Sequence, residues 1–274
     1  MLLENEARLS EMELLRLCEI VNSRLGFSYG PEKKMLIVTR LERRLRQLNI
    51  GNISQYIQRL QDDPLEVNEF IELLTTNVTS FFREKHQLEI VNRTILPVLK
   101  AKDRKVFCWS AGCSSGEEAY TLSMMFSDAF SGDGRFSILA SDINVQKLKE
   151  AMKGVYSSEA VKDIPDNYFR RYFMPLPGEQ ESYQVRNELR RTITFRKINL
   201  NEEFDIPANI RFDIIFCRNV LIYFSKASRE QLIDRFHAIL NDGGYLVLGT
   251  CETMDVHRDP RWKPLKNSIF LKRV

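Results

Sequence analysis

The sequence predicts an α/β protein: a small all-helical N-terminal domain, then a doubly wound, mostly parallel α/β domain with a small inserted β-subdomain. Between Ser10 and about Asn77, apolar residues recur at helical spacing with no convincing strand. Further along, short apolar runs alternate with helical segments, which is the pattern of a parallel sheet covered by helices. The 274 residues are enough for both domains.

The helical N-terminal domain is predicted over residues 1–76. Turn residues at 26–31, 49–51 and 62–64 divide it into four or so helices. One helix begins at Pro31, ends near Leu48 and buries an apolar stripe. Its opposite sector is basic, so it is either a solvated face or a docking surface for an acidic helical partner. The cations of this sector are Lys33, Arg40, Arg43 and Arg44.

A linker and the first helix of the next domain are predicted over residues 77–99. The linker, NVTSFFR, is polar and aromatic, and its two phenylalanines are expected to wedge it against the α/β domain. Its polar side chains would then face a cleft, although a helix stop, a turn hydroxyl and a surface cation are the ordinary alternatives. Those side chains are Asn77, Thr79 and Arg83.

The α/β domain is predicted over residues 100–274 and is organised around KVFCWSAGCSSGEE at 105–118. An apolar run there gives way to small residues and then to a helix start, which predicts a strand, a tight turn and a helix. The turn lacks the full G-x-G-x-x-G spacing. Gly112 and Gly116 therefore either cradle a ligand or only let the helix pack close to the strand.

Acidic residues near this turn distinguish between classes of ligand. A second apolar run, 136–141, ends in Asp142, where an acid takes ribose hydroxyls in nucleotide-binding α/β folds. Glu117 and Glu118 begin the preceding helix, where the macrodipole favours them but where they would repel a phosphate. S-adenosylmethionine has an ammonium, a sulfonium and a ribose diol but no phosphate. The acids therefore favour it over a dinucleotide.

The remaining elements complete the sheet. Helices are expected at 118–130, 144–152 and 226–240, and strands at 192–198, 212–217, 245–250 and 268–272. Residues 154–191 are predicted to form the inserted subdomain, with a hairpin on the rim of the sheet. Ligands of parallel sheets bind beyond the carboxyl ends of the strands. The polar residues expected there are Glu117, Asp142, Asn199, Arg218 and Asn219.

Composition excludes several other classes of protein. Forty basic and 37 acidic residues leave a net charge of +3, and the basic sector lacks interleaved aromatics, so no nucleic acid partner is expected. The five cysteines form no C-x-x-C pair and the three histidines are isolated, which predicts neither disulfides nor a metal site. No apolar run approaches the length of a membrane span, so the protein is expected to be cytoplasmic without direct membrane insertion.

Four collinear segments resemble the CheR chemoreceptor glutamate methyltransferases: NVTSFFR at 77–83, WSAGCSSGEE at 109–118, ASDI at 140–143 and FCRNVLIYF at 216–224. The resemblance implies a Rossmann-like class I methyltransferase domain without a metal. It also implies transfer of a methyl group from S-adenosylmethionine to receptor glutamates, giving methyl esters and S-adenosylhomocysteine, and recruitment to membrane-bound receptor arrays. Whether the insert binds a receptor tail stays open.

The resemblance also implies roles for individual residues, beginning with the linker. Asn77, Thr79 and Arg83 match residues that approach the cofactor, and Arg83 suits its carboxylate. Glu117 matches the acid at the cofactor's amino group, and Asp142 matches the acid at the ribose. Arg83 is in addition the first of two residues expected to take part in catalysis, because it could be shared between cofactor and substrate.

Further roles follow from matches later in the chain. Asn199 and Leu200 would lie along the adenine, and Arg218 and Asn219 would close the pocket. Tyr223 matches an aromatic hydroxyl near the transferred methyl group, which makes it the second residue expected in catalysis. Alternatively, Tyr223 has only a structural role, as a buried aromatic residue whose hydroxyl is hydrogen-bonded within the protein.

The implied chemistry needs few groups from the protein. A glutamate carboxylate is already ionised at neutral pH, so no general base is required, and donors such as Arg83 and Tyr223 are expected to hold it in line. The acidic helical bundle of a chemoreceptor would dock on the basic sector. Two alternatives stay open: a methyltransferase that uses the same cofactor on another substrate, and a non-catalytic signalling module that senses the cofactor.

Overall fold

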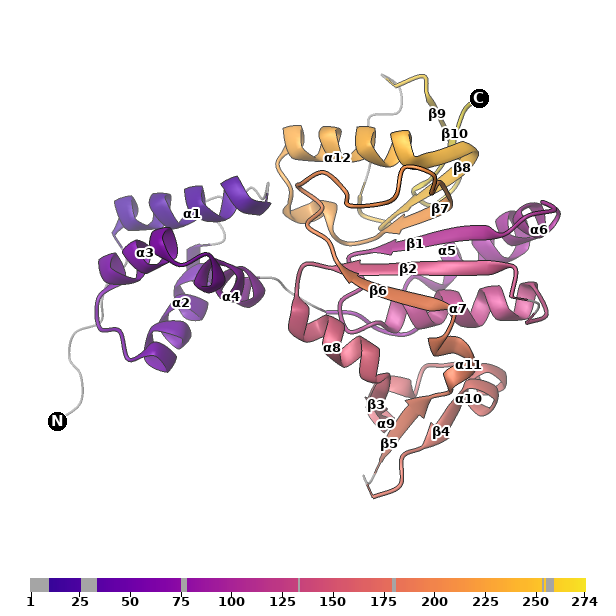
Figure 1. Ribbon diagram of the computed structural model, residues 1–274, viewed down its shortest axis with the longest axis horizontal. Coiled ribbons are helices and arrows are strands. Elements are labelled where there is room, and N and C mark those ends of the chain that lie inside the picture. The colour runs from indigo at the N-terminus through magenta and orange to yellow at the C-terminus, as the bar shows by residue number, and fades with distance from the viewer. Residues whose placement is uncertain are drawn as a thin grey trace. The chain divides into compact units, whose positions relative to one another are not determined.

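The computed structural model describes residues 10–25, 34–74, 78–132, 134–178, 181–252, 254 and 259–274 (Figure 1). The chain divides into two compact units: one comprises residues 1–76 with 223–230, and the other 77–222 with 231–274. None of the helices in these ranges is long and apolar enough to cross a membrane.

The first unit is helical, as predicted. Its described part contains α1 (Glu11–Leu25), α2 (Lys34–Leu48), α3 (Ile53–Asp62) and α4 (Pro64–Leu74). The start of α3 is set by Asn52, whose side chain accepts the backbone N–H of Ser54 and so satisfies a free amide of the first turn. Buried side chains such as Leu41, Tyr56 and Phe70 form the core of the bundle. The predicted helix start at Pro31 lies outside the described residues.

The second unit is built on a mostly parallel sheet, which confirms the predicted fold class. The order of its strands, within the described residues, is β6-β2-β1-β7-β8-β10-β9. The first five run parallel, whereas β10 is antiparallel to both of its neighbours. The strands are β1 (Val106–Ala111), β2 (Phe136–Asp142), β6 (Ile193–Lys197), β7 (Phe212–Cys217), β8 (Leu240–Leu248), β9 (Trp262–Pro264) and β10 (Ile269–Lys272).

The strand order reverses direction at β1, because β2 and β6 lie on one side of it and β7 and β8 on the other. In an open α/β sheet such a reversal leaves a crevice beyond the carboxyl ends of the two central strands. The loops after β1 and β7 therefore border the place where a ligand is expected. The loop after β1 leads into Glu117, the first residue of helix α7, and the loop after β7 begins with Arg218.

Three helices accompany the strands as predicted: α7 (Glu117–Ala129), α8 (Val145–Lys153) and α12 (Lys226–Ile239). The helix predicted from Lys85 to Leu99 is interrupted. It consists of α5 (Lys85–Ile90), a π-helical turn η2 (Val91–Ile95) and α6 (Leu96–Lys100). Pro97 explains the interruption, because it lacks an N–H and its ring clashes with the carbonyl four residues earlier in a regular α-helix.

Two further boundaries differ from the prediction. Strand β8 begins at Leu240, five residues before the predicted Tyr245, because Leu240 already pairs with Phe212 ahead of an irregularity in the ladder. Strand β9 was not predicted, since three residues that include a proline carry no periodic signal.

The insert forms a small antiparallel sheet of its own, in the order β3-β5-β4. This agrees with the predicted hairpin, and Figure 1 shows the small sheet apart from the large one, beyond α8 and α11. Its elements are β3 (Val155–Ser157), α9 (Ser158–Val161), α10 (Asp166–Tyr172), β4 (Phe173–Pro175), β5 (Ser182–Val185) and α11 (Asn187–Arg190).

Trp109 anchors the centre of the large sheet. Its ring is fully buried against Phe204, Phe212 and Phe236 at centroid distances of 4.9, 5.3 and 5.4 Å. Its indole N–H donates to the Ser141 hydroxyl at 2.9 Å. This hydrogen bond fixes the end of β1 against the end of β2, where the candidate site begins.

Candidate functional site

The turn after β1 is fastened to the end of β2 by backbone hydrogen bonds. The amides of Gly112 and Cys113 both donate to the Ser141 carbonyl at 2.8 Å. The next amide, from Ser114, donates to the Asp142 carboxylate at 2.8 Å. The turn and the acid after β2 therefore form one rigid piece of the site.

Both glycines of this turn are required by packing within the protein. Gly112 has φ 91° and Gly116 has φ 96°, a region that side chains disfavour. A Cβ on Gly112 would lie 2.5 Å from the Val220 side chain, and one on Gly116 would lie 2.8 Å from the Cβ of Ala151. Close packing against Val220 and against α8 therefore requires both glycines, and their role in cradling a ligand stays a prediction.

Glu117 and Asp142, the two acids predicted to hold the cofactor, are both buried: Glu117 is the first residue of α7 and Asp142 is the last residue of β2. Each is 8% exposed. The Asp142 carboxylate also accepts the Asn144 amide at 2.8 Å, and the Glu117 carboxylate accepts the Ser115 hydroxyl at 2.8 and 3.0 Å. Burial raises the pKa of both acids despite these hydrogen bonds. A bound cation would favour their ionised forms.

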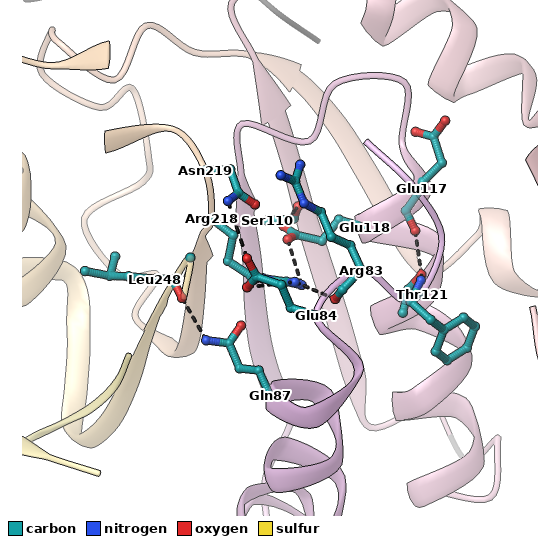
Figure 2. A network of polar contacts seen from close by, with 12 residues as sticks. Arg83, Glu84, Gln87, Ser110, Glu117, Glu118, Thr121, Arg218, Asn219 and Leu248 are labelled. Atoms are coloured by element: carbon teal, nitrogen blue, oxygen red, sulfur yellow. Dashed lines mark hydrogen bonds and ion pairs between the residues drawn. The ribbon is translucent and has the colours of Figure 1, made fainter. Parts of the chain in front are cut away.

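Arg218, predicted to close the pocket, is almost fully buried between two carboxylates (Figure 2). Its guanidinium lies 3.2 Å from Glu84 and 3.3 Å from Glu118, and it donates to the Arg83 carbonyl at 2.5 Å. Glu118 in turn accepts the Ser110 hydroxyl at 2.7 Å. Arg218 therefore joins the linker to β1, α7 and the end of β7.

Glu84 is a site residue that the sequence analysis missed. Besides Arg218, its carboxylate accepts the Asn219 side-chain amide at 3.4 Å and the Thr250 hydroxyl at 3.1 Å. Burial opposes its ionisation, but Arg218 and donors on Thr250 and Asn219 prevail and hold its pKa below the usual value. Its φ of 59° is uncommon for a glutamate, which indicates that these contacts hold the backbone in place.

The linker is also bound to α7. The Phe82 amide donates to the Thr121 hydroxyl at 3.1 Å, and Thr121 donates to the Glu117 carbonyl at 2.7 Å. The guanidinium of Arg83 donates to the Val78 carbonyl at 2.8 Å, and Figure 2 shows it turned away from the contacts of Arg218. The predicted Asn77 lies outside the described residues.

A second missed residue, Glu252, organises the loop after β7. It is 4% exposed, and its carboxylate accepts the backbone amides of Gly249, Asn219 and Ile222 at 2.7, 2.8 and 3.2 Å. Burial raises its pKa against the effect of these donors. Glu252 thereby holds Asn219 in its left-handed conformation, with φ 59°.

The other predicted residues are placed as follows. Thr79 is partly buried in the linker. Asn199 and the buried Leu200 follow β6, and the Ile198 amide ahead of them donates to the Asp142 carbonyl at 3.2 Å, which brings them beside that acid. Tyr223 ends the short helix η3 (Leu221–Tyr223), is partly buried and belongs to the first compact unit. Its catalytic role stays a prediction.

Two cations of the basic sector of α2 form hydrogen bonds within the helical unit itself. Arg44 forms two hydrogen bonds, of 2.8 and 2.9 Å, to Glu66, which is 3% exposed and also accepts the Tyr56 hydroxyl. Arg40 donates to the Leu73 carbonyl, whereas Arg43 is exposed. Lys33 lies outside the described residues, and docking by this sector stays a prediction.

The site residues described above carry more acids than bases: Glu84, Glu117, Glu118, Asp142 and Glu252 against Arg83 and Arg218. This excess fits a cationic ligand better than a phosphate. Across the described ranges, His, Cys, Asp and Glu side chains form no group of three or more that could hold a metal ion.

Comparison with known proteins gives family models that cover most of the chain. Residues 77–269 match "CheR methyltransferase, SAM binding domain", and residues 12–75 match "CheR methyltransferase, all-alpha domain". A chemotaxis protein methyltransferase of Borreliella burgdorferi is 35% identical over 252 residues, 88% of each chain. Chemotaxis protein methyltransferase 2 of Pseudomonas aeruginosa is 36% identical over 89% of this chain and 87% of its own. The Escherichia coli chemotaxis protein methyltransferase is 33% identical over 96% and 91%.

Proposed function

Because this chain belongs to the CheR methyltransferase family, we propose that it transfers the methyl group of S-adenosylmethionine to glutamate carboxylates of chemoreceptors. The products are glutamate methyl esters and S-adenosylhomocysteine. The observation that carries the proposal is a pair of buried acids in the domain that matches the family's cofactor-binding model: Glu117, which begins the helix after β1, and Asp142, which ends the neighbouring strand β2.

These acids suit the parts of the cofactor differently. We assign Glu117, the first residue of α7, to the ammonium group, as the resemblance to the family implies. Asp142 uses its oxygens to accept two backbone amides, and a carboxylate retains lone pairs for the ribose hydroxyls. Asn199 and Leu200, beside Asp142, would contact the adenine.

The cofactor supplies an activated methyl group on a positively charged sulfur, which leaves as a neutral thioether. The protein then has to exclude water and align the acceptor. We assign alignment of the acceptor carboxylate to Arg83 and Tyr223, whose hydrogen bonds must stay weak enough to leave it nucleophilic. No general base is needed, since the acceptor is ionised at neutral pH.

The acceptor is presented by a partner protein in this proposal. The cytoplasmic part of a chemoreceptor is an acidic helical bundle, and the basic sector of α2 would attract it. Arg43 is the exposed cation of that sector within the described residues, so it is the cation to test first.

Incubation with methyl-labelled S-adenosylmethionine and receptor cytoplasmic fragments tests the proposal. We expect label on receptor glutamates that is released as methanol by base, as methyl esters are. Glu117→Gln should abolish most of the labelling at limiting cofactor, whereas Glu150→Gln, an exposed acid on the neighbouring helix α8, should not. Base-stable label would indicate another acceptor, and cofactor binding without label would indicate a sensor.

A further inference from the structure

A tyrosine of the inserted subdomain reaches the turn of the candidate cofactor site. Tyr156 lies in β3, where it pairs with Tyr183 of β5 in the small sheet. Its hydroxyl donates to the Ser115 carbonyl at 2.7 Å, across 41 positions of sequence. The insert is therefore hydrogen-bonded directly to the turn after β1.

Ser115 also makes a separate side-chain hydrogen bond to Glu117, the acid at the start of α7. The Ser115 hydroxyl donates to both oxygens of the Glu117 carboxylate, at 2.8 and 3.0 Å. A Cβ on Gly116 would lie 3.0 Å from the Tyr156 hydroxyl, so glycine at this position is what admits the tyrosine. Tyr156, Ser115 and Glu117 thus form one connected set, in which Ser115 contacts both of the others.

The ring of Tyr156 is held on two sides. It is 7% exposed and packs edge-on against Phe81 of the linker, with centroids 4.9 Å apart, and against Tyr120 of α7 at 6.1 Å. Phe81 also packs edge-on against Phe173 of β4 at 5.6 Å. Burial raises the pKa of Tyr156 well above its usual value, so its hydroxyl remains a donor at every physiological pH.

We propose that Tyr156 is a positioning residue for the cofactor, through which the inserted subdomain fixes Ser115 and thereby the carboxylate of Glu117. The inference rests on the proposed function, because it takes the ligand of Glu117 to be the ammonium group of S-adenosylmethionine. It gives the insert a part in cofactor binding that does not depend on any receptor.

The test is Tyr156→Phe, which removes only the hydroxyl. We expect the dissociation constant of S-adenosylhomocysteine, measured by calorimetry, to rise about three- to tenfold, the equivalent of one hydrogen bond. The KM for S-adenosylmethionine should rise similarly, with little change in kcat, because the acceptor's position is unaffected. Unchanged affinity would overturn the inference.

Tyr120→Phe is the matched control. Tyr120 is also buried, its hydroxyl also donates to a backbone carbonyl, that of Ala151 at 2.8 Å, and the two rings are in contact. We expect both variants to lose similar thermal stability but only Tyr156→Phe to lose affinity. Equal losses of affinity would mean that loosening of the core, and not positioning of Glu117, is responsible.

A double-mutant cycle locates the effect. In a Glu117→Gln background, Tyr156→Phe should cost no further affinity if it acts through that carboxylate. If Tyr156→Phe lowers cofactor affinity as much in this background as in the wild type, Tyr156 does not act through Glu117. If the wild-type protein bound neither S-adenosylmethionine nor S-adenosylhomocysteine, the proposed function would be overturned as well. If the wild type bound them and Tyr156→Phe bound them equally well, this inference alone would be refuted.

Discussion

A single guanidinium, that of Arg218, holds the linker against the sheet by sharing two carboxylates. Removing one of these carboxylates leaves the buried charge of Arg218 less well compensated. The resulting destabilisation affects Arg218 and its neighbour Asn219, the residues predicted to close the pocket. Of the two carboxylates, Glu84 makes the wider set of contacts, since it also accepts donors from Asn219 and Thr250.

We predict that Glu84→Gln raises the dissociation constant of S-adenosylhomocysteine by about tenfold or more, because hydrogen bonds to charged groups contribute about 1.5–3 kcal/mol and each 1.4 kcal/mol is tenfold. Titration calorimetry measures the change. Glu89→Gln in α5, the helix that Glu84 precedes, is the control, since Glu89 is exposed. Wild-type affinity in Glu84→Gln would show that Arg218 keeps its position without that carboxylate.

The raised pKa values of Glu117 and Asp142 predict a pH dependence of cofactor binding. An acid whose pKa is raised becomes neutral at a higher pH on acidification than an exposed acid, whose pKa is about 4. Attraction for the cationic cofactor should therefore weaken on acidification from neutral pH, before exposed carboxylates titrate. Calorimetry at a series of decreasing pH values tests this, and affinity that stays constant until exposed carboxylates titrate, at about pH 4, would contradict it.

Individual residues could be predicted where a strand end is visible in the sequence. Glu117, Asp142 and Arg218 follow recognisable apolar runs, and the structure places them at the carboxyl edge of the sheet. Glu84 and Glu252 could not be predicted, because their roles depend on partners 134 and 33 positions away. Nothing local in the sequence distinguishes either of them from a surface acid.

At the scale of the helix, the basic sector of α2 combines cations with different surroundings. Arg44 is held by the buried Glu66, whereas Arg43 is exposed. Helical periodicity alone groups these neighbours together. It could not reveal that a buried acid on α4 neutralises one of them, so the sector that can meet a partner is narrower than the sequence indicated.

We predict that Arg44→Gln and Arg43→Glu have different effects. Arg44→Gln should lower the free energy of unfolding of the helical unit by about 3 kcal/mol, because it leaves the buried Glu66 with the half-exposed Arg59, 3.7 Å away, in place of its close partner. Hydrogen exchange in peptides from α3 and α4 measures this. Arg43→Glu should leave stability within about 0.5 kcal/mol.

The same pair tests receptor docking. Arg43→Glu should slow receptor methylation at low salt. The effect should be smaller at high salt, because salt screens the proposed attraction between Arg43 and the acidic receptor. An unchanged rate at low salt would rule out Arg43 as part of the docking surface. A slow rate in Arg44→Gln alone would instead reflect the loss of stability.

For the molecule as a whole, the alternation of strands and helices sufficed to predict a mostly parallel sheet. The antiparallel pairing of β10 was not predicted, because periodicity is the same for either direction of a strand. The π-helical turn before α6 and the short strand β9 also lay beyond what spacing can show.

We predict that S-adenosylhomocysteine at a hundredfold excess over its dissociation constant stabilises the unit that holds the site by about 2.7 kcal/mol. Hydrogen exchange should slow in β1, β2 and β7, which lead into the site. Peptides from α3, in the first compact unit, serve as the comparison and should exchange as before. Equal protection there would mean that the two units open together.

The carboxylate of Glu252 constrains how this enzyme can be recombined with its relatives. It connects the loop after β8 to the segment after β7 through two main-chain amides, those of Asn219 and Ile222, which any amino acid except proline can provide. A chimera that imports residues 218–222 therefore keeps the contacts to Glu252 whatever side chains stand at 219 and 222, but it still needs Arg218 and Asn219 for their contacts to Glu84. It must keep both the length of that loop and a glutamate at position 252, so the two loops are exchanged safely only as a matched set.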